Sequence, residues 1–263
     1  MIVVVGSLNM DLVIRAPRLP QPGETIAGGP FGTYPGGKGA NQAVAAARLG
    51  AATAMIGCVG DDDFGRALLH SLHENGVRSE MVQIVAGPSG TALITVEARG
   101  QNTIVIAPGA NFMLDPQKID AAAGLLAQAR ILLLQLETPL AASIRAAEQA
   151  RAAGTTVILN PAPAPGEPLP QELLRLVDYL TPNEGEAIAL LGGNAPDTPP
   201  AMAAALRRQL GVPAAIVTLG ERGAILADAA GITAQPAFPV TAIDTTAAGD
   251  AFIGGFAAAL LQG

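Results

Sequence analysis

The sequence has very little cysteine, histidine or aromatic residue. Its 263 residues include one cysteine, two histidines, two tyrosines and no tryptophan. A single cysteine, Cys58, excludes an internal disulfide, and two histidines leave too few soft ligands for a zinc site. Chains without disulfides are typical of a reducing compartment, so we expect a cytoplasmic location.

Charged residues are also scarce, and positive ones are the scarcer. Only 14% of the chain is charged, and 22 acidic against 15 basic residues give a net charge of −7. Such a chain lacks the attraction on which nonspecific nucleic-acid binding depends, so no nucleic-acid partner is expected. The longest uncharged stretch, 81–96, contains Gly87-Pro88 and is too short to span a bilayer. No membrane partner is expected either.

What the sequence does contain is an alternation of short β-branched runs with alanine-rich segments of helical length. Strand-like runs occupy 131–136, 156–159 and 215–219, and helix-like segments occupy 141–153 and 184–191. Strands separated by such helices predict βαβ units and a parallel sheet covered on both faces. We therefore expect an α/β fold with a doubly wound, mostly parallel sheet flanked by helices.

Two segments break this alternation and predict a small antiparallel sheet. Residues 11–34 contain several prolines and a Gly28-Gly29-Pro30 turn, and 91–107 has two strand-like runs around Arg99-Gly100-Gln101. No linker long enough to separate folding units occurs. We expect residues 1–263 to form a single domain, from which about 11–34 and 91–107 project as a β lid.

A polar turn at 244–250 opens a helix of small residues. Unpaired backbone N–H groups at a helix start suit an anion, and small side chains let a phosphate approach closely. We expect Asp250 to take a proton from a hydroxyl, while the preceding amides stabilise charge on a transferred phosphoryl group. Those amides belong to Ala247, Ala248 and Gly249. The alternative is that Thr246 or Asp250 only caps the helix.

A second glycine-rich segment, 34–42, also leads into an alanine-rich helix. It is not a P-loop, because Lys38 is followed by glycine instead of serine or threonine. Lys38 and Asn41 therefore suit hydroxyl groups better than a triphosphate. The alternative is a purely structural helix entry.

In this order, the two motifs resemble those of the ribokinase-type (PfkB) carbohydrate kinase family. The likeness extends along nearly the whole chain, through 6–11, 22–25, 135–137, 160–163 and 181–186. Within the family, GGKGANQ, QLE and NPAPA resemble ribokinases more than adenosine kinases or fructokinases. The resemblance implies ATP-dependent phosphorylation of D-ribose at the 5-hydroxyl, giving ribose 5-phosphate.

The resemblance also implies a sugar pocket, in which separate segments supply both donors and acceptors. Glu137 is supported independently, because it follows an apolar strand and ligands bind at the carboxyl edge of parallel sheets. The alternatives are a turn for Asn9 and Asp11 and a favourable helix-start charge for Glu137. The implied sugar-binding residues are Asn9, Asp11, Gly37, Lys38, Asn41, Glu137 and Asp250.

A nucleotide and metal ions are implied on the other side. The spacing of Asn183 and Glu186 puts both on one face of a helix start, where acids are favoured in any case. By resemblance Asn183 faces the phosphates, Glu186 orients Mg²⁺ through water, and Asp244 and Thr246 contribute to a monovalent-cation site, usually filled by K⁺. The implied nucleotide-binding residues are Asn183, Thr218, Gly220, Gly223 and Gly249.

The lid is implied to close over the sugar and to pair with a second subunit, giving a homodimer. The alternative is a surface hairpin without a partner. Family members usually continue beyond the catalytic helix, whereas this sequence stops at Leu261-Gln262-Gly263. The missing part ordinarily walls the adenine pocket and adds cation ligands, so we expect weak or adenine-indifferent nucleotide binding.

Two rival functions remain open at this point. One is a kinase for deoxyribose, fructose or a nucleoside, although few aromatic rings are present to stack on a base. The other is a sugar-binding or regulatory protein that lacks transfer activity.

Overall fold

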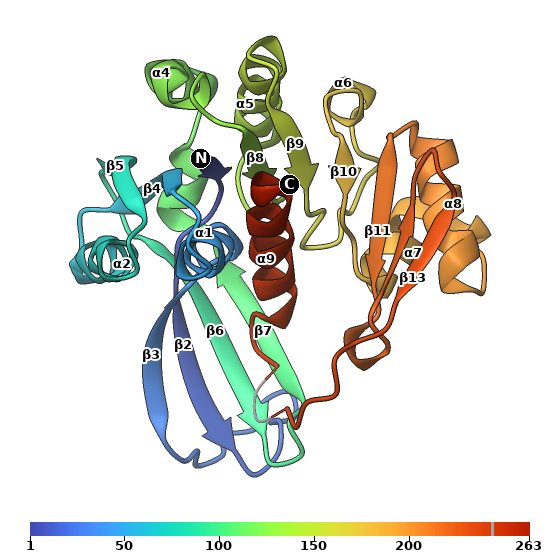
Figure 1. Cartoon of the computed structure of the whole chain (residues 1–263). Helices are drawn as coiled ribbons and strands as arrows, with labels where there is room; N and C mark the ends of the chain where they lie inside the picture. The colour runs from blue at the N-terminus through green and yellow to red at the C-terminus, as the bar shows by residue number, and fades with distance from the viewer. Residues whose placement is uncertain (243–244) are drawn as a thin grey trace.

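The computed structural model describes residues 1–242 and 245–263 (Figure 1). In these residues a nine-stranded sheet has the order β13-β12-β11-β10-β9-β8-β1-β4-β5. All neighbours from β5 to β11 pair in parallel, and β12 and β13 add an antiparallel edge. The predicted mostly parallel α/β sheet is confirmed. Its strands are β1 (Ile2–Val5), β4 (Thr53–Gly60), β5 (Arg78–Val85), β8 (Ile131–Leu134), β9 (Thr156–Leu159), β10 (Tyr179–Leu180), β11 (Ala214–Thr218), β12 (Ala224–Ala227) and β13 (Ile232–Gln235).

Helices cover both faces of this sheet, as the doubly wound plan requires. The described helices are α1 (Lys38–Arg48), α2 (Asp63–Glu74), α3 (Pro116–Ala121), α4 (Ala123–Leu126), α5 (Leu140–Ala152), α6 (Gln171–Leu174), α7 (Glu184–Leu191), α8 (Pro199–Leu210) and α9 (Ala248–Gln262), with short 3₁₀ turns at Gly109–Met113, Gly192–Asn194 and Gly220–Arg222. Among them none is both long and apolar enough to cross a lipid bilayer.

The strands are buried on both sides, which explains their continuous apolar character. In β1, Val3 and Val5 belong to one core cluster, and Ile2 and Val4 to the other. The first cluster includes side chains of α3 to α8, and the second includes those of α1, α2 and α9. The sheet therefore separates two hydrophobic layers.

A four-stranded sheet of order β3-β2-β6-β7 projects from the main body (Figure 1). Its strands are β2 (Asn9–Ala16), β3 (Phe31–Gly36), β6 (Gly90–Glu97) and β7 (Asn102–Ala107). The outer pairs are antiparallel, as expected, but the central pair β2–β6 is parallel. The reason is topological, because β2 follows β1 and β6 follows β5, and β1 and β5 run the same way.

Several element boundaries differ from expectation in ways that matter for the site. Helix α1 begins at Lys38, so Lys38 and Asn41 lie in a first helical turn. Helix α9 begins at Ala248, so Asp250 also lies in a first turn. Helix α6 is only a single turn. Propensity defined the long elements, whereas local hydrogen bonding set their ends.

Helices α1 and α9 lie against each other on one face of the sheet. Glycine at 254 makes this possible, because a Cβ there would lie 2.6 Å from the backbone oxygen of Gln42. Gly39 likewise allows α1 to approach the end of β1, because a Cβ at this position would lie 2.6 Å from the backbone nitrogen of Ser7. The starts of α1 and α9 are thus held close to the end of β1.

Replacing Gly254 with alanine should lower the free energy of unfolding by about 1–3 kcal/mol, because the new methyl group forces α9 away from α1. Gly255→Ala is the matched control. Its Cβ would meet only Leu49 Cδ1 at 3.5 Å, so better helix propensity should raise stability by about 0.5–1 kcal/mol. Urea unfolding of both variants measures the difference, and equal effects would contradict the packing argument.

Candidate active site

Polar residues collect where the parallel strands end. Asn9 lies just beyond β1, Glu137 beyond β8, Asn160 beyond β9 and Asn183 beyond β10. The chain winds away from β1 toward β4 and later returns to β8 on its other side. This reversal of strand order leaves a crevice at the carboxyl edge, which is where open α/β sheets bind ligands.

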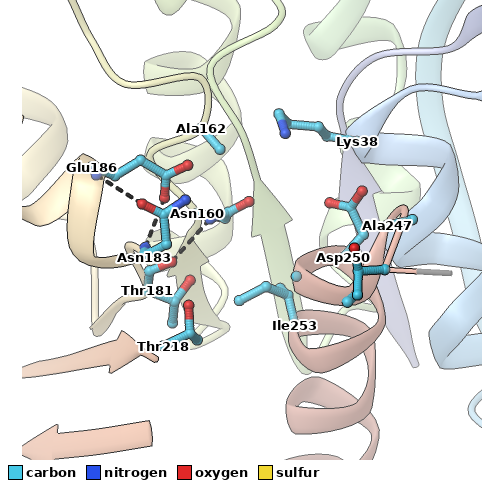
Figure 2. Close-up of a pocket in the computed structure, with 13 residues that line it drawn as sticks. Lys38, Asn160, Ala162, Thr181, Asn183, Glu186, Thr218, Ala247, Asp250 and Ile253 are labelled. Carbon is cyan, nitrogen blue, oxygen red and sulfur yellow. Dashed lines mark hydrogen bonds between the residues drawn. The ribbon is translucent and has the colours of Figure 1, made fainter. Parts of the chain in front are cut away.

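A cavity of about 230 Å³ lies at this edge. In Figure 2, Lys38 and Asp250 stand on one side of it, and Asn183, Glu186 and Thr218 stand on the other. Segments more than 200 residues apart thus share one space. The lining residues are Lys38, Asn160, Ala162, Thr181, Asn183, Glu186, Thr218, Thr245, Ala247, Ala248, Gly249, Asp250 and Ile253.

The carboxylate of Asp250 is buried, with 7% of the residue exposed, and is held from α1. Asn41 Nδ2 donates to its Oδ2 at 3.1 Å, and Gln42 Nε2 donates to its Oδ1 at 3.1 Å. Helix α9 has no side-chain cap at its N-cap residue, Ala247. The capping alternative therefore does not describe Asp250, whose oxygens accept from a different helix and face the cavity.

The backbone before Asp250 forms a tight turn into α9. Ala247 has a φ of 57°, in the left-handed region that disfavours residues with a Cβ. The Ala248 N–H donates to Thr245 O at 3.2 Å, and the Ala251 N–H donates to Ala247 O at 2.8 Å. Of the amides expected to meet an anion, that of Ala248 is therefore engaged by the turn itself, and a phosphate would have to replace this bond.

Glu137 is fixed by residues that follow β1 and begin α1. Its Oε2 accepts from Ser7 Oγ at 2.5 Å, from the Lys38 N–H at 3.2 Å and from Asn9 Nδ2 at 3.5 Å. Asn111 Nδ2 donates to Asn9 Oδ1 at 2.7 Å, so the Asn9 amide must turn its NH₂ toward Glu137. In this structure the Glu137 carboxylate accepts hydrogen bonds from several segments of the chain. It is not an unpaired charge at the start of a helix.

Asp11 joins the same electrostatic group from β2. Burial, together with the nearby charges of Glu137 and Asp250, raises the pKa of its carboxyl to about 6, while Lys38 opposes this shift. These charge effects show that Asp11 lies within electrostatic reach of Glu137, Asp250 and Lys38. Gly37 lies between this strand pair and α1. The position requires glycine, because its φ is 90° and because a Cβ there would lie 2.6 Å from the backbone nitrogen of Asn9.

Asn183 and Glu186 form a capping box at the start of α7. Asn183 Oδ1 accepts from the Glu186 N–H, and Glu186 Oε2 accepts from the Asn183 N–H, both at 2.8 Å. The helix-start alternative is thus part of the structure, yet Glu186 is only 9% exposed and lines the cavity. Burial raises the pKa of Glu186, while the hydrogen bond from the Asn183 N–H and the charge of Lys38 oppose this shift.

The remaining predicted positions occupy the same edge or lie just outside it. Thr218 ends β11 and lines the cavity, whereas Gly220 and Gly223 lie in the turn between β11 and β12. Thr246 lies in the exposed turn before α9. Asp244 falls outside the described residues.

Buried polar residues that sequence reasoning left without a role complete the site. Gln42 and Gln135 are buried behind Asp250, and Ser7 and Asn111 behind Glu137 and Asn9. The positions of Ser7 and Gln135 could have indicated a role in the site, because both residues follow apolar strands at the carboxyl edge of the sheet, where ligands bind. Their spatial partners were not readable from the chain.

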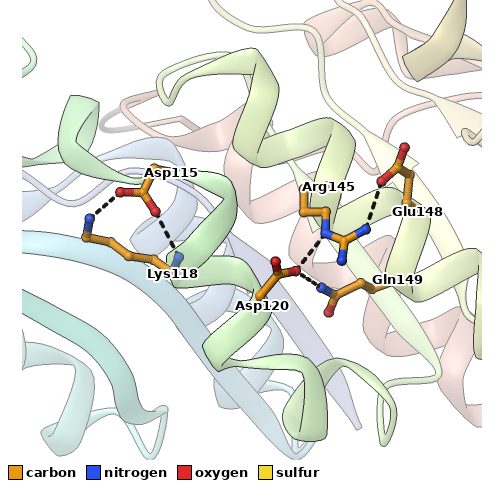
Figure 3. A network of polar contacts seen from close by, with 6 residues as sticks. All are labelled: Asp115, Lys118, Asp120, Arg145, Glu148 and Gln149. Carbon is orange, nitrogen blue, oxygen red and sulfur yellow. Dashed lines mark hydrogen bonds and ion pairs between the residues drawn. The ribbon is translucent and has the colours of Figure 1, made fainter.

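Charged side chains on the surface of α3 and α5 form a second polar network (Figure 3). Each acid in it is paired with a base or amide at the surface, and exposed pairs of this kind contribute little. It links α3 to α5, because Arg145 and Gln149 both donate to Asp120. Its members are Asp115, Lys118, Asp120, Arg145, Glu148 and Gln149.

Comparison with known proteins adds to this geometry. The family described as pfkB family carbohydrate kinase matches residues 1–263. A ribokinase of Haemophilus influenzae is 42% identical over 98% of this chain and 85% of its own length. A deoxyribokinase of Salmonella typhi is 41% identical over 97% and 84%. The structure of Arabidopsis thaliana ribokinase complexed with ribose and ATP superposes with a TM-score of 0.91 at 36% identity, over 100% of this chain and 86% of that chain.

The raised pKa of Asp11 makes stability depend on pH. Between about pH 4 and 6 the folded chain keeps a proton that the unfolded chain has lost, so the free energy of unfolding falls as pH rises through this window. Asp11→Asn removes that fall and should be more stable than wild type at pH 7.5, by roughly 1 kcal/mol after solvent screening, or about 2 °C in melting temperature.

Glu24→Gln is the matched control for this measurement. A hydrogen bond from Arg18 lowers the pKa of Glu24 to about 2, so its own linkage lies below pH 4.5. Thermal melts at pH 4.5 and 7.5 should show the wild-type difference in Glu24→Gln and a smaller one in Asp11→Asn. An unchanged difference in Asp11→Asn would refute the assignment.

Proposed function

Because this chain belongs to the pfkB family of carbohydrate kinases, we propose that it transfers the γ-phosphoryl group of ATP to the 5-hydroxyl of D-ribose, giving ribose 5-phosphate and ADP. The observation that carries the proposal is the meeting of Asp250, Asn41, Lys38 and Glu137 at one sheet edge, with Asn183 and Glu186 across the cavity. Acid, hydroxyl-binding groups and phosphate-facing groups are the parts that the reaction needs.

Asp250 takes the hydroxyl proton in this mechanism. The oxygen of the 5-hydroxyl attacks the γ-phosphorus, its proton passes to the Asp250 carboxylate, and the bond from the γ-phosphorus to the β–γ bridging oxygen breaks to release ADP. Such transfer depends on positioning and charge neutralisation more than on covalent help. Lys38 and the amides of Ala247 to Gly249 supply positive potential beside the migrating group.

The other hydroxyls of the sugar need partners of defined polarity. Asn9, with its amide oriented by Asn111, offers a donor, and Asp11 and Glu137 offer acceptors. Gly37 lets the backbone approach the sugar closely. Together with Lys38 and Asn41, these groups can satisfy a ring with several hydroxyls.

A magnesium ion fits the residues on the opposite side. Mg²⁺ prefers oxygen ligands, keeps most of its waters and needs one or two carboxylates plus the substrate phosphates. Glu186 provides a buried carboxylate at the cavity, and no cluster of three or more metal-binding side chains occurs among the described residues. Such an ion would neutralise charge on the phosphates, with Glu186 orienting its waters and Asn183 facing the nucleotide.

A monovalent cation, K⁺ in the first instance, is proposed near the turn that precedes α9. Asp244 and Thr246 would contribute to it, together with the negative potential of the turn's carbonyl groups. Thr218, Gly220, Gly223 and Gly249 are proposed to contact the nucleotide from the adjoining edge.

The small sheet is proposed to act as a lid and as a dimer interface. Every residue of β7 is exposed, and Leu93 and Val105, which pair across β6 and β7, are 56% and 65% exposed. Apolar side chains presented this way on one face favour burial against a second copy. A closed lid would also keep water from accepting the phosphoryl group.

Ribose and its nearest rival, deoxyribose, differ by a single hydroxyl group. The relatives at 42% and 41% identity carry the names ribokinase and deoxyribokinase, so identity does not separate ribose from deoxyribose. The Arabidopsis structure with ribose and ATP favours ribose. A pocket that hydrogen-bonds the 2-hydroxyl rejects an analogue that lacks it.

We propose a cytoplasmic location, where ATP and sugar are both present.

Asp250→Asn should lower kcat by about 10²- to 10⁴-fold and leave the ribose Kd within about threefold, because the proton acceptor is lost while the size and shape of the side chain are kept. ADP release, measured with ribose, deoxyribose, fructose and adenosine, tests the substrate and the base together. Asp63→Asn, an exposed acid at the start of α2, is the control and should match wild type. Ordinary turnover by Asp250→Asn, or wild-type inactivity with all four substrates, would refute the proposal.

Val105→Glu should convert a dimer of 26.4 kDa chains into monomers, because the new charge would lie in the proposed interface. Ile84→Glu is the control, since Ile84 is 60% exposed on β5, the edge strand of the other sheet. Light scattering during gel filtration measures the mass. A monomeric wild type, or equal behaviour of the two variants, would contradict the interface.

A further inference from the structure

A row of buried amide side chains runs behind Asp250. Gln42 is fully buried and Gln135 is 1% exposed, and neither is among the residues that line the cavity. Gln135 Nε2 donates to Gln42 Oε1 at 2.6 Å, and Gln42 Nε2 donates to Asp250 Oδ1 at 3.1 Å. The row joins the end of β8 to α1 and then to the first turn of α9.

The carboxylate at one end determines how every amide in this row is turned. A carboxylate only accepts hydrogen bonds, so Gln42 must present its NH₂ group to Asp250. Its Oε1 then faces Gln135, which has to present its own NH₂ group in return. Each amide therefore has one orientation that satisfies its neighbours.

Asn160 fixes the second N–H of Gln42. Gln42 Nε2 also donates to Asn160 Oδ1 at 3.1 Å, and Asn160 Nδ2 donates to Thr181 O at 2.9 Å. Asn160 and Thr181 line the opposite part of the cavity, beyond β9 and β10 (Figure 2). Gln42 thus connects the proposed base to the sheet edge that carries the nucleotide-facing residues.

This orientation has a cost at the far end of the row. Gln135 Oε1 is buried and has no hydrogen-bond partner in the described part of the chain, which is unfavourable for stability. Gly6 makes room for it, because a Cβ at that position would lie 2.0 Å from this oxygen. An unsatisfied buried oxygen is expected where function, more than stability, fixes the side chains.

We propose that Gln42 is a positioning residue that holds the Asp250 carboxylate at one angle, and that Gln135 locks the Gln42 amide for this purpose. The inference rests on the proposed kinase function. No side chain of the N-cap residue caps the start of α9, and Asp250 instead accepts hydrogen bonds from two amide groups of α1. These two donors define the rotamer of Asp250. A carboxylate fixed in advance does not have to reorient when the hydroxyl proton is transferred.

Gln42→Met keeps the length of the side chain and removes its donors. We expect kcat to fall by about 10- to 100-fold while the ribose and ATP KM values stay within about threefold, because positioning of the base is lost and sugar contacts are kept. Gln135→Met should lower kcat by a smaller factor. The double variant should be no slower than Gln42→Met, since Gln135 acts only through Gln42.

Thr155→Val is the matched control for a purely structural loss. Thr155 is 1% exposed and donates to Ala129 O at 2.8 Å, at the opposite edge of the sheet. This variant should lose stability and keep its kcat. Folded Gln42→Met enzyme with kcat within twofold of wild type, or independent effects of the two glutamine variants, would overturn the proposal.

A measurement on wild-type protein covers the case in which the variants do not fold. In protein labelled with ¹⁵N-glutamine, the side-chain NH₂ protons of Gln42 should exchange slowly with solvent and shift in Asp250→Asn. Fast exchange without a shift overturns the inference. If wild type phosphorylates no sugar, the proposed function fails, and this spectrum still decides whether Gln42 holds Asp250.

Discussion

The close packing of α1 against α9 is the constraint on which the rest of the site depends. Only with a glycine at 254, beside the backbone oxygen of Gln42, do the first turns of the two helices come near enough for α1 to supply both hydrogen bonds to Asp250. The helices belong to opposite ends of the chain, and this contact brings Lys38 and Asp250 to the same side of the cavity. Without it, Asp250 would be an acid in the first turn of a helix with no partner from α1.

The site also gathers more negative charge than the fold requires. Asp11 lies within electrostatic reach of two other acidic residues, Glu137 and Asp250, and of Lys38. Repulsion and burial act together on Asp11, whose pKa rises to about 6. A core built for stability would avoid this arrangement, whereas a pocket for a ligand with several hydroxyls needs acceptors held apart from water. The energetic disadvantage is therefore itself an indication of function.

The sequence predicted the long elements well and the positions of side chains less well. Apolar runs and alanine-rich segments defined the parallel sheet, because period and length are local properties. The starts of α1 and α9 were placed too late, since Gly37 and Ala247 act as N-cap residues without a capping side chain. The parallel pairing of β2 with β6 depends on where β1 and β5 lie in the other sheet, which is a long-range property. For the same reason Gln42 and Gln135 could be read as buried polar residues but not as partners of Asp250.

The connection of the small sheet to the site follows from chain geometry. Strand β2 carries Asn9 and Asp11 at its beginning, and β3 ends at Gly36, two residues before Lys38. Any movement of this sheet therefore shifts Asn9 and Asp11, two of the groups proposed to hold the sugar. Asp250 and its amide donors belong to α1, α9 and the main sheet, so they stay in place. The sugar contacts of Asn9 and Asp11 can follow the proposed lid while the base keeps its angle, because β2 belongs to the small sheet and the donors to Asp250 belong to α1.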